Sequence, residues 1–395
     1  MISVKEALDI ILAHPFQSGT EQVSLMNSVG RVSGAFVFAD RDLPPYNRVA
    51  MDGIAVRFED LSKGLRKFKV AGIAIAGIPG IELNDAGTAI EVMTGAVLPS
   101  GSDVVIRYED LRNEGDHFNV LINEFKIFQN VHRKGSDAKH NEELLKPGIV
   151  ISPAEIPLMA SVGVSAVTVK TLPRIGLIST GDELVEIDEQ PLAHQIRTSN
   201  VYAIMAGLKE AGAVCSMYHL GDQDPEFQQK LDDILSKCDV VILSGGVSKG
   251  KLDRVPEALE RAGIKKQFHQ VAQRPGKPLW FGTGGGKIVF ALPGNPVSVF
   301  LCLYKYIRPW LLCSMNAATE NFSAVLDKDF VSDLPLTHFL QVRVHRTDGV
   351  LRAMPVPGGG SGDFANLRHI SGFLELPPGA GLCSSGRAFP FIPIR

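Results

Sequence analysis

The chain has 395 residues, which is enough for roughly two to four domains with substantial hydrophobic cores. Its 40 basic and 43 acidic side chains give a formal net charge of -3, which excludes a long-range electrostatic attraction to nucleic acid or to an anionic membrane. Hydrophobic residues make up 45% of the chain, and the longest apolar stretch, 297–313, contains Lys305 and Arg308, so it predicts a buried helix and no membrane span.

The N-terminal segment, residues 3–15, predicts an amphipathic helix. Ser3 is the expected N-cap, and Glu6 follows at the position that completes a capping box. The segment lacks the pattern of a secretory signal peptide. The chain has 5 cysteines and no CxxC pair, so we expect reduced thiols in the cytoplasm, with neither a disulfide framework nor a zinc knuckle.

A β-rich module is predicted from about residue 37 to residue 131, where short alternating segments are separated by Gly, Asn and Pro. Residues 152–162 return to a helical pattern. Ser152 is the expected N-cap of this helix, Pro153 lies in its first turn and Gly163 ends it.

Three loops of the β-rich module place a carboxylate or a hydroxyl beside or near glycine. They are Met51-Asp52-Gly53, Met93-Thr94-Gly95-Ala96 and Arg133-Lys134-Gly135-Ser136-Asp137. Taken singly, each loop is typical of a local turn in which such a side chain bonds the nearby backbone. The residues alone therefore leave open whether these side chains serve a turn or a functional site.

Strands and helices alternate after residue 173. Strands are predicted at 174–179, 214–220, 239–243 and 287–291, and helices at 199–211, 225–236, 253–262 and from about 296 onward. This alternation predicts a mostly parallel, doubly wound α/β sheet. We expect Pro309 and the polar stretch 316–321 to end that domain, and the short strands of 322–395 to form a small barrel or sandwich.

Two small-residue loops follow neighbouring predicted strands of this sheet. Residues 244–248 read Ser-Gly-Gly-Val-Ser after the apolar run 240–243, and residues 292–298 follow the strand at 287–291. Ligands bind at such strand ends in open α/β sheets, where glycine lets backbone N–H groups approach an oxyanion closely. The loops therefore predict a pocket for a phosphate or a similar oxyanion; a tight turn that needs small residues is the alternative.

Charged side chains accompany these loops. Arg274 and Lys277 lie in the stiff segment Gln-Arg-Pro-Gly-Lys-Pro at 273–278, which favours oxyanion binding over a merely solvated surface. The motif Thr-Gly-Asp-Glu at 180–183 ends the first strand of the domain, where its acids can hold Mg²⁺, bond ribose hydroxyls or cap the next helix. No histidine has metal-ligand spacing, and neither a G-x-S-x-G elbow nor a P-loop is present, so hydrolysis by a nucleophilic serine and P-loop phosphoryl transfer have no support.

Eight segments together resemble the molybdopterin molybdenumtransferase family, which comprises the bacterial MoeA proteins and the homologous domains of plant molybdenum insertases and animal gephyrin. The segments are PPYNRVAMDGIAV at 44–56, EVMTGAVLPSGSDVVIRYED at 91–110, NVHRKGSDAKHNEELLKPG at 130–148, PRIGLISTGDELVE at 173–186, QIRTSN at 195–200, SGGVSKGKLD at 244–253, RPGKP at 274–278 and LPGNPVS at 292–298. Their order and spacing extend the resemblance over nearly the whole chain.

The resemblance implies a multidomain α/β plus β architecture. It divides the chain into a segmented helical linker domain (1–36 and 141–172), an inserted β-rich module (37–140), a doubly wound molybdopterin-binding α/β domain (173–316) and a C-terminal β-barrel (317–395). It further implies a homodimer, in which the inserted module of one subunit completes the α/β pocket of the other.

The activity implied by the resemblance is a Mg²⁺-dependent transfer that inserts molybdate into adenylylated molybdopterin, releases AMP and yields molybdenum cofactor. The implied catalytic residues are Asp52, Thr94, Asp137, Glu183, Asp253 and Lys277, and four of them, Asp52, Asp137, Glu183 and Asp253, would hold Mg²⁺. The implied residues for binding the pterin phosphate and molybdate are Thr180, Gly181, Asp182, Ser244, Gly245, Gly246, Ser248, Arg274, Gly294, Asn295 and Ser298.

Two other functions stay open at this point. The same fold can serve as a non-catalytic molybdopterin carrier or scaffold, and tungstate is close to molybdate in size and charge. The resemblance also implies contact with the molybdopterin adenylyltransferase and with proteins that modify the cofactor downstream, and no contact with nucleic acid or membrane.

Overall fold

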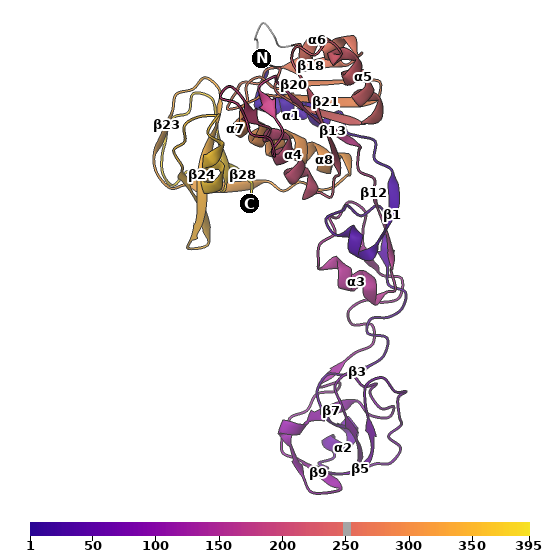
Figure 1. Cartoon of the computed structure of the whole chain (residues 1–395). Coiled ribbons are helices and arrows are strands. Elements are labelled where there is room, and N and C mark those ends of the chain that lie inside the picture. The colour runs from indigo at the N-terminus through magenta and orange to yellow at the C-terminus, as the bar shows by residue number, and fades with distance from the viewer. Residues whose placement is uncertain (248–253) are drawn as a thin grey trace. The chain divides into compact units, whose positions relative to one another are not determined.

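The computed structural model of the protein describes residues 1–247 and 254–395. The chain forms two compact units (Figure 1). The main unit comprises Met1–Gly34, Pro147–Ser152 and Ala166–Arg395, and the inserted unit comprises Ala35–Lys146 and Pro153–Ser165. The finer division into four domains stays a prediction.

A six-stranded sheet forms the centre of the main unit. Its order is β16 (Cys215–Leu220), β13 (Ile175–Thr180), β17 (Val240–Ser244), β21 (Lys287–Leu292), β20 (Trp280–Gly284) and β18 (Lys265–His269). The first four strands are parallel, as predicted, and β20 and β18 add an antiparallel edge. This edge was not predicted, because Lys265–His269 is mostly polar and exposed and Trp280–Gly284 ends in glycine.

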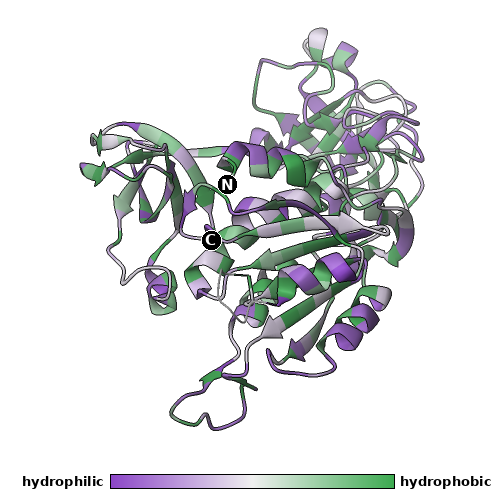
Figure 2. Cartoon of the chain, turned by 90° about the horizontal axis from the view of Figure 1, so that it is seen from above, coloured by the Kyte–Doolittle hydropathy of each residue, from purple (hydrophilic) through white to green (hydrophobic). Residues whose placement is uncertain are grey.

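Helices cover both faces of this sheet. One face carries α1 (Val4–Leu12), α4 (Asn200–Lys209), α7 (Pro296–Cys302) and α8 (Arg308–Ser314), and the other carries α5 (Phe227–Lys237) and α6 (Val255–Arg261). Ile242 of β17 packs into the first core, whereas Val241 and Leu243 pack into the second. Burial on both faces explains why the central strands are mostly apolar, and the strands are largely green between mixed green and purple helices (Figure 2).

Two helix predictions near the ends of the α/β region have different outcomes. Ser3 caps α1, and Ser3 and Glu6 form the predicted capping box. The domain end that the sequence predicts at Pro309 and the polar stretch 316–321 stays a prediction. A π-helical turn, Leu303–Ile307, joins α7 to α8, and Pro309 lies in the first turn of α8, where a missing N–H is tolerated.

The inserted unit contains a six-stranded sheet with apolar cores on its two faces. Its order is β7 (Val104–Arg107), β4 (Gly53–Val56), β6 (Thr88–Val92), β5 (Lys67–Ala74), β9 (His117–Val120) and β8 (Leu111–Asn113). Short pairs join β3 (Arg48–Val49) to β10 (Val131–His132) and β2 (Val37–Phe38) to β11 (Glu143–Leu145), and the helices are α2 (Phe58–Ser62), α3 (Glu155–Ser161) and the short η2 (Tyr108–Asp110). The N-cap of α3 is Ala154, two residues after the predicted Ser152, because the proline segment forms a turn before the helix begins.

The C-terminal region forms the predicted barrel. Strands β24 (Thr337–Thr347), β25 (Val350–Pro355), β22 (Phe322–Leu326), β28 (Ala388–Pro393) and β26 (Gly372–Leu376) follow one another, and the pairing of β26 with β24 closes the ring. Outside the barrel, β19 (Gln273–Arg274) pairs with β24 and β23 (Phe330–Ser332) pairs with β27 (Gly381–Cys383). The remaining elements are β1 (Thr20–Ser24) with β12 (Ala166–Lys170), β14 (Leu184–Val185) with β15 (Ile196–Arg197), η1 (Leu25–Ser28) and η4 (Phe364–His369).

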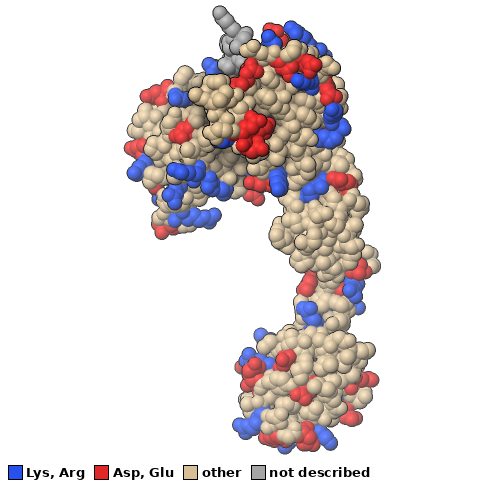
Figure 3. Space-filling view, in the orientation of Figure 1, with Lys and Arg blue, Asp and Glu red and all other residues tan. Residues whose placement is uncertain are grey.

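Three general properties bear on function. All five cysteines are free thiols. No helix within the described part of the chain has both the length and the apolar character needed to cross a membrane. Basic and acidic side chains are interspersed over the visible surface of each unit (Figure 3), in line with the small net charge.

Candidate functional site

Three parallel strands of the main unit end side by side in the predicted loops. Thr180 ends β13, Ser244 ends β17, and Leu292 ends β21. The N–H of Gly245 donates to the carbonyl of Leu292 at 3.1 Å, and the hydroxyl of Thr180 donates to the carbonyl of Ser244 at 3.4 Å. The sheet therefore brings the three predicted loops together at one edge.

The glycines of the 244–247 loop are required by close backbone packing. Gly245 has φ +104°, and a Cβ on it would lie 2.6 Å from the Thr180 hydroxyl; Gly246 has φ +68°, and its Cβ would lie 2.6 Å from Val255 Cγ2. Any larger residue would push β17 away from β13. Because the N–H of Gly245 is already bonded to the carbonyl of Leu292, this glycine allows close packing on Thr180 and offers no free donor.

Asn200, at the start of α4, connects two of the loops. Its amide nitrogen Nδ2 donates to Ser244 Oγ at 2.9 Å and to the carbonyl of Gly294 at 2.7 Å. Asn200 lies within the segment QIRTSN that carries the family resemblance, but no role was predicted for it. Its position directly after Ser199, the N-cap of α4, was the available signal.

A glycine-rich loop of the C-terminal region also reaches this edge. Asn295 Nδ2 donates to Ser361 Oγ at 2.7 Å, and the N–H of Val297 donates to the Ser361 carbonyl at 3.1 Å. Ser361 lies in the glycine-rich sequence Gly-Gly-Gly-Ser-Gly at 358–362, a detectable signal of a binding loop that was not among the predicted site residues. The loop fixes Asn295 at the beginning of α7.

The segment 273–278, here called the cation loop, lies on α7. Gly276 packs so closely that a Cβ would lie 3.3 Å from Cys302 Sγ and 3.7 Å from the Ser298 carbonyl. Ser298 itself is only 2% exposed. Arg274 and Lys277 point into solvent, and neither forms an ion pair with any acid that the structure describes. Two uncompensated cations therefore flank the strand-end loops.

The acids of the main unit lie next to the same strand ends. The side chain of Glu183 folds back onto Gly181, where a Cβ would be 2.5 Å from the carboxylate oxygen Oε2, and Asp182 approaches Gly221 at the end of β16. Asp224 is held by Lys230 at 2.7 Å and by the N–H of Glu226 at 2.9 Å, contacts that lower its pKa. Asp224 is therefore engaged locally, whereas Asp182 and Glu183 are exposed at the edge.

In the inserted unit, Asp52 and Thr94 are in direct contact. Asp52 Oδ1 accepts hydrogen bonds from the Thr94 N–H at 2.6 Å and the Thr94 hydroxyl at 2.8 Å. These two bonds lower the pKa of the exposed Asp52 carboxyl, so it is a carboxylate at neutral pH. One carboxylate oxygen is thus held in place while the other faces solvent, an arrangement suited to binding a ligand.

Asp137 is positioned by a chain of side chains in the same unit. His132 lies 2.6 Å from Asp137 Oδ1 through Nε2 and 2.8 Å from Arg48 through Nδ1. Because a guanidinium only donates, Nδ1 of His132 must accept and Nε2 must carry the proton that goes to Asp137. The pairing of β3 with β10 brings Arg48 and His132 opposite one another.

The predicted metal ligands are divided between the two compact units, with Asp52 and Asp137 in the inserted unit and Glu183 in the main unit. No group of three or more His, Cys, Asp or Glu side chains in residues 1–247 and 254–395 has the arrangement of a metal site. Ser248 and Asp253 lie outside the described residues. The assignment of Asp52, Asp137 and Glu183 to Mg²⁺ therefore stays a prediction, and no chemical step is routed through the metal.

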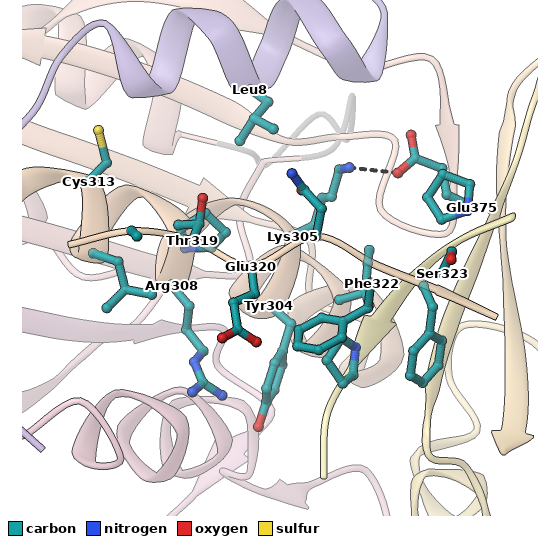
Figure 4. Close-up of a pocket in the computed structure, with 18 of the residues that line it drawn as sticks. Leu8, Tyr304, Lys305, Arg308, Cys313, Thr319, Glu320, Phe322, Ser323 and Glu375 are labelled. Carbon is teal, nitrogen blue, oxygen red and sulfur yellow. Dashed lines mark hydrogen bonds and ion pairs between the residues drawn. The ribbon is translucent and has the colours of Figure 1, made fainter. Parts of the chain in front are cut away.

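A second concave region of the main unit has a different character. A groove of about 1390 Å³ lies between α8 and the barrel strands, lined by side chains such as Leu8, Tyr304 and Phe322 (Figure 4). Both cations that line it are paired, Lys305 with Glu375 at 2.6 Å and Arg308 with Glu210 at 2.8 Å. The groove therefore lacks the free cations found at the strand-end loops.

Models of known protein families match three consecutive parts of the chain. Residues 2–163 match the MoeA N-terminal region (domain I and II), residues 176–312 match a probable molybdopterin binding domain, and residues 323–394 match the MoeA C-terminal region (domain IV).

Full-length relatives and solved structures agree with these matches. A molybdopterin molybdenumtransferase of Synechocystis sp. is 37% identical over 99% of this chain and 99% of its own length, and one of Bacillus subtilis is 31% identical over 100% and 94%. The crystal structure of the molybdopterin biosynthesis MoeA protein of Pyrococcus horikoshii superposes with a TM-score of 0.83 at 27% identity, covering 99% of each chain.

Proposed function

The chain belongs to the molybdopterin molybdenumtransferase family, and from this premise we propose that it inserts molybdenum, supplied as molybdate, into adenylylated molybdopterin with release of AMP. The observation that carries the proposal is the meeting of the strand-end loops with the cation loop at one edge of the α/β sheet. Both substrates are anions, and this edge offers tightly packed glycine backbone next to two unpaired cations.

The cation loop is assigned to molybdate. Arg274 offers a planar set of donors and Lys277 a point charge, and both are free of acidic partners among the described residues. Ser298, whose backbone carbonyl lies beside Gly276, is the proposed hydroxyl of the same site. These groups offset the repulsion between molybdate and the pyrophosphate of the second substrate, so that positioning and charge neutralisation make the main contribution to the rate.

The strand-end loops are assigned to the phosphate end of adenylylated molybdopterin. Thr180, Gly181, Ser244, Gly246 and Gly294 provide a narrow polar edge, and Asn200 holds two of its loops together. Asp182 and Glu183 at this edge, and Asp253 outside the described residues, are the proposed acids of the main unit.

Magnesium is proposed as a cofactor that arrives with the substrate. Mg²⁺ keeps several waters and is commonly bound by one or two carboxylates together with substrate phosphates, and it would neutralise charge on the departing AMP. This mode needs no preformed cluster of acids in the protein. Asp52, with its depressed pKa, and Asp137 are the proposed carboxylates of the inserted unit.

A homodimer is proposed as the working form. The assigned residues fall in both compact units, and the family resemblance implies that the inserted unit of one copy serves the main unit of the other. The resemblance likewise supports the cytoplasm as the compartment and exchange of pterin substrates with the adenylyltransferase and with later cofactor-modifying proteins.

The transferase is distinguished from a carrier by the fate of the adenylyl group. Purified protein is incubated with adenylylated molybdopterin, molybdate and Mg²⁺, and the bound and released nucleotides are separated and measured. We expect free AMP and molybdenum cofactor to form together. Retention of intact adenylylated molybdopterin after molybdate is added would establish a carrier and overturn the transferase. Repeating the assay with tungstate measures the preference between the two oxyanions.

A further inference from the structure

Beneath the exposed side chains of the cation loop lies a buried polar pair, Gln273 and Tyr306. Both residues are 0% exposed. The Tyr306 hydroxyl donates to Gln273 Oε1, and Gln273 Nε2 donates to the Gly276 carbonyl at 3.2 Å. We propose that this pair is a positioning device that orients Arg274 and Lys277 for molybdate, an inference that rests on the proposed function.

The hydroxyl of Tyr306 is well suited to act as a permanent donor. Tyr306 lies on the π-helical turn between α7 and α8, in the middle of the hydrophobic core. Burial raises its pKa well above the ordinary value, so the phenol keeps its proton. A buried glutamine oxygen without this donor would be costly, and so the pair fixes the rotamer of Gln273.

Gln273 in turn fixes the middle of the loop. Gly276 has φ +86°, and a Cβ there would lie 2.7 Å from Gln273 Nε2, so the backbone lies directly on the amide. The two ends of the loop are closed by the N–H groups of Val271 and Leu279, which both donate to the Lys277 carbonyl, at 2.9 and 3.0 Å. The backbone is thus fixed from below and at its ends, and only the side chains of Arg274 and Lys277 reach solvent.

This arrangement links the core of the main unit to oxyanion affinity. Bringing two cations to one ligand costs free energy, because the cations repel each other and lose conformational freedom. In a rigid loop these costs are part of folding and do not reduce the affinity for the ligand. Without the Tyr306 hydroxyl, the carbonyl of Gly276 loses a fixed donor and the loop can relax. We therefore expect affinity for molybdate to depend on a hydroxyl that touches no substrate.

The test uses Tyr306→Phe, which keeps the aromatic ring and removes only the hydroxyl. We expect the KM for molybdate and the Kd from calorimetric titration with molybdate alone to rise about tenfold, since one buried hydrogen bond has that value. The KM for adenylylated molybdopterin is expected to stay within about twofold.

A double variant separates positioning from stability. Tyr306→Phe leaves a buried amide oxygen without a donor, whereas Tyr306→Phe combined with Gln273→Met removes both polar partners. We expect the double variant to recover the unfolding midpoint of the wild type and still bind molybdate weakly. Recovery of molybdate affinity together with stability would overturn the positioning role and leave only a structural one.

Two control variants complete the experiment. Tyr304, on the same turn, faces the groove, and its hydroxyl lies 3.5 Å from the Ile394 carbonyl, so Tyr304→Phe should leave molybdate affinity unchanged (Figure 4). Lys277→Met should lose far more affinity than Tyr306→Phe. Normal affinity in Lys277→Met would refute the assignment of the cation loop to molybdate, whereas normal affinity in Tyr306→Phe alone would refute only the positioning proposal.

Discussion

At the scale of single residues, hydrogen bonding and burial determine which groups are charged. Asp52 is held as a carboxylate by two bonds from Thr94, while one of its oxygens remains exposed. Asp224, by comparison, has its charge matched by Lys230. The contacts of an aspartate, and not its residue type, therefore determine whether its carboxylate is available to a ligand or is neutralised within the protein.

Asp52→Asn tests the role of that carboxylate. The amide keeps the size of the side chain but cannot supply a negative charge to a metal or to a developing cation. Because Asp52 is exposed, we expect the unfolding midpoint to stay nearly unchanged while kcat falls by at least about a hundredfold. AMP release at saturating substrate measures the effect, and Asp116→Asn, an exposed acid of the same unit bonded to His117, is the matched control. Turnover near the wild-type rate in Asp52→Asn would remove this residue from the site.

The imidazole of His338 makes the free energy of unfolding depend on pH. Burial, followed by the charge of Arg274, lowers its pKa below the ordinary value of 6.5. The unfolded chain therefore takes up a proton at a higher pH than the folded one. The stability that the neutral imidazole contributes is fully present above pH 6.5 and is lost as the pH falls through the lower folded pKa. Urea unfolding above and below 6.5 should show a smaller loss of stability in His338→Gln than in the wild type. An unchanged pH dependence would contradict this, and exposed His194→Gln is the control.

At the scale of elements, the cost of replacing a glycine of positive φ by alanine depends on what surrounds the new methyl group. Gly245→Ala should destabilise the protein by about 2 kcal/mol or more, because the new methyl group meets Thr180 and φ is positive. Gly263 also has a positive φ, at +81°, but no atom lies within 4 Å of its Cβ position, so Gly263→Ala should cost only about 1 kcal/mol. Urea midpoints measure both changes. Equal costs would mean that packing on Thr180 adds nothing.

Predictability from the sequence also differs between elements. The parallel strands β13, β17 and β21 were predictable because burial on both faces makes them continuously apolar. The antiparallel strand β18 was not, since its exposed edge is polar. The division of the apolar run into α7 and α8 was not predicted, because a proline such as Pro309 does not by itself distinguish the end of a helix from the first turn of the next one.

The candidate site was likewise only partly predictable from the sequence. Its glycines, acids and cations stand in recognisable motifs, so Ser244, Glu183 and Lys277 could be predicted from the sequence as site residues. The contacts that organise them were not, because Asn200, Ser361 and Tyr306 are distant in sequence from the groups that they hold. Such long-range hydrogen bonds leave no periodic pattern in the chain.

At the scale of the whole molecule, the proposed homodimer makes a distinct prediction for mixed dimers. Asp52→Asn and Lys277→Met should each inactivate the protein, but in opposite units. A dimer with one copy of each variant, purified by two different tags, should recover about half of the wild-type activity if each site uses both subunits. Activity no higher than that of the two parent variants would show that both residues act within one chain or that one is not required.

The proposed reaction couples molybdenum insertion to removal of the adenylyl group. This coupling is measured by the ratio of AMP released to molybdenum incorporated. Both quantities are measured in one reaction, by chromatography of nucleotides and by elemental analysis of the protein-bound pterin. We expect a ratio of about one, with almost no AMP when molybdate is omitted. AMP release at the same rate without molybdate, or incorporation of molybdenum without AMP, would contradict it.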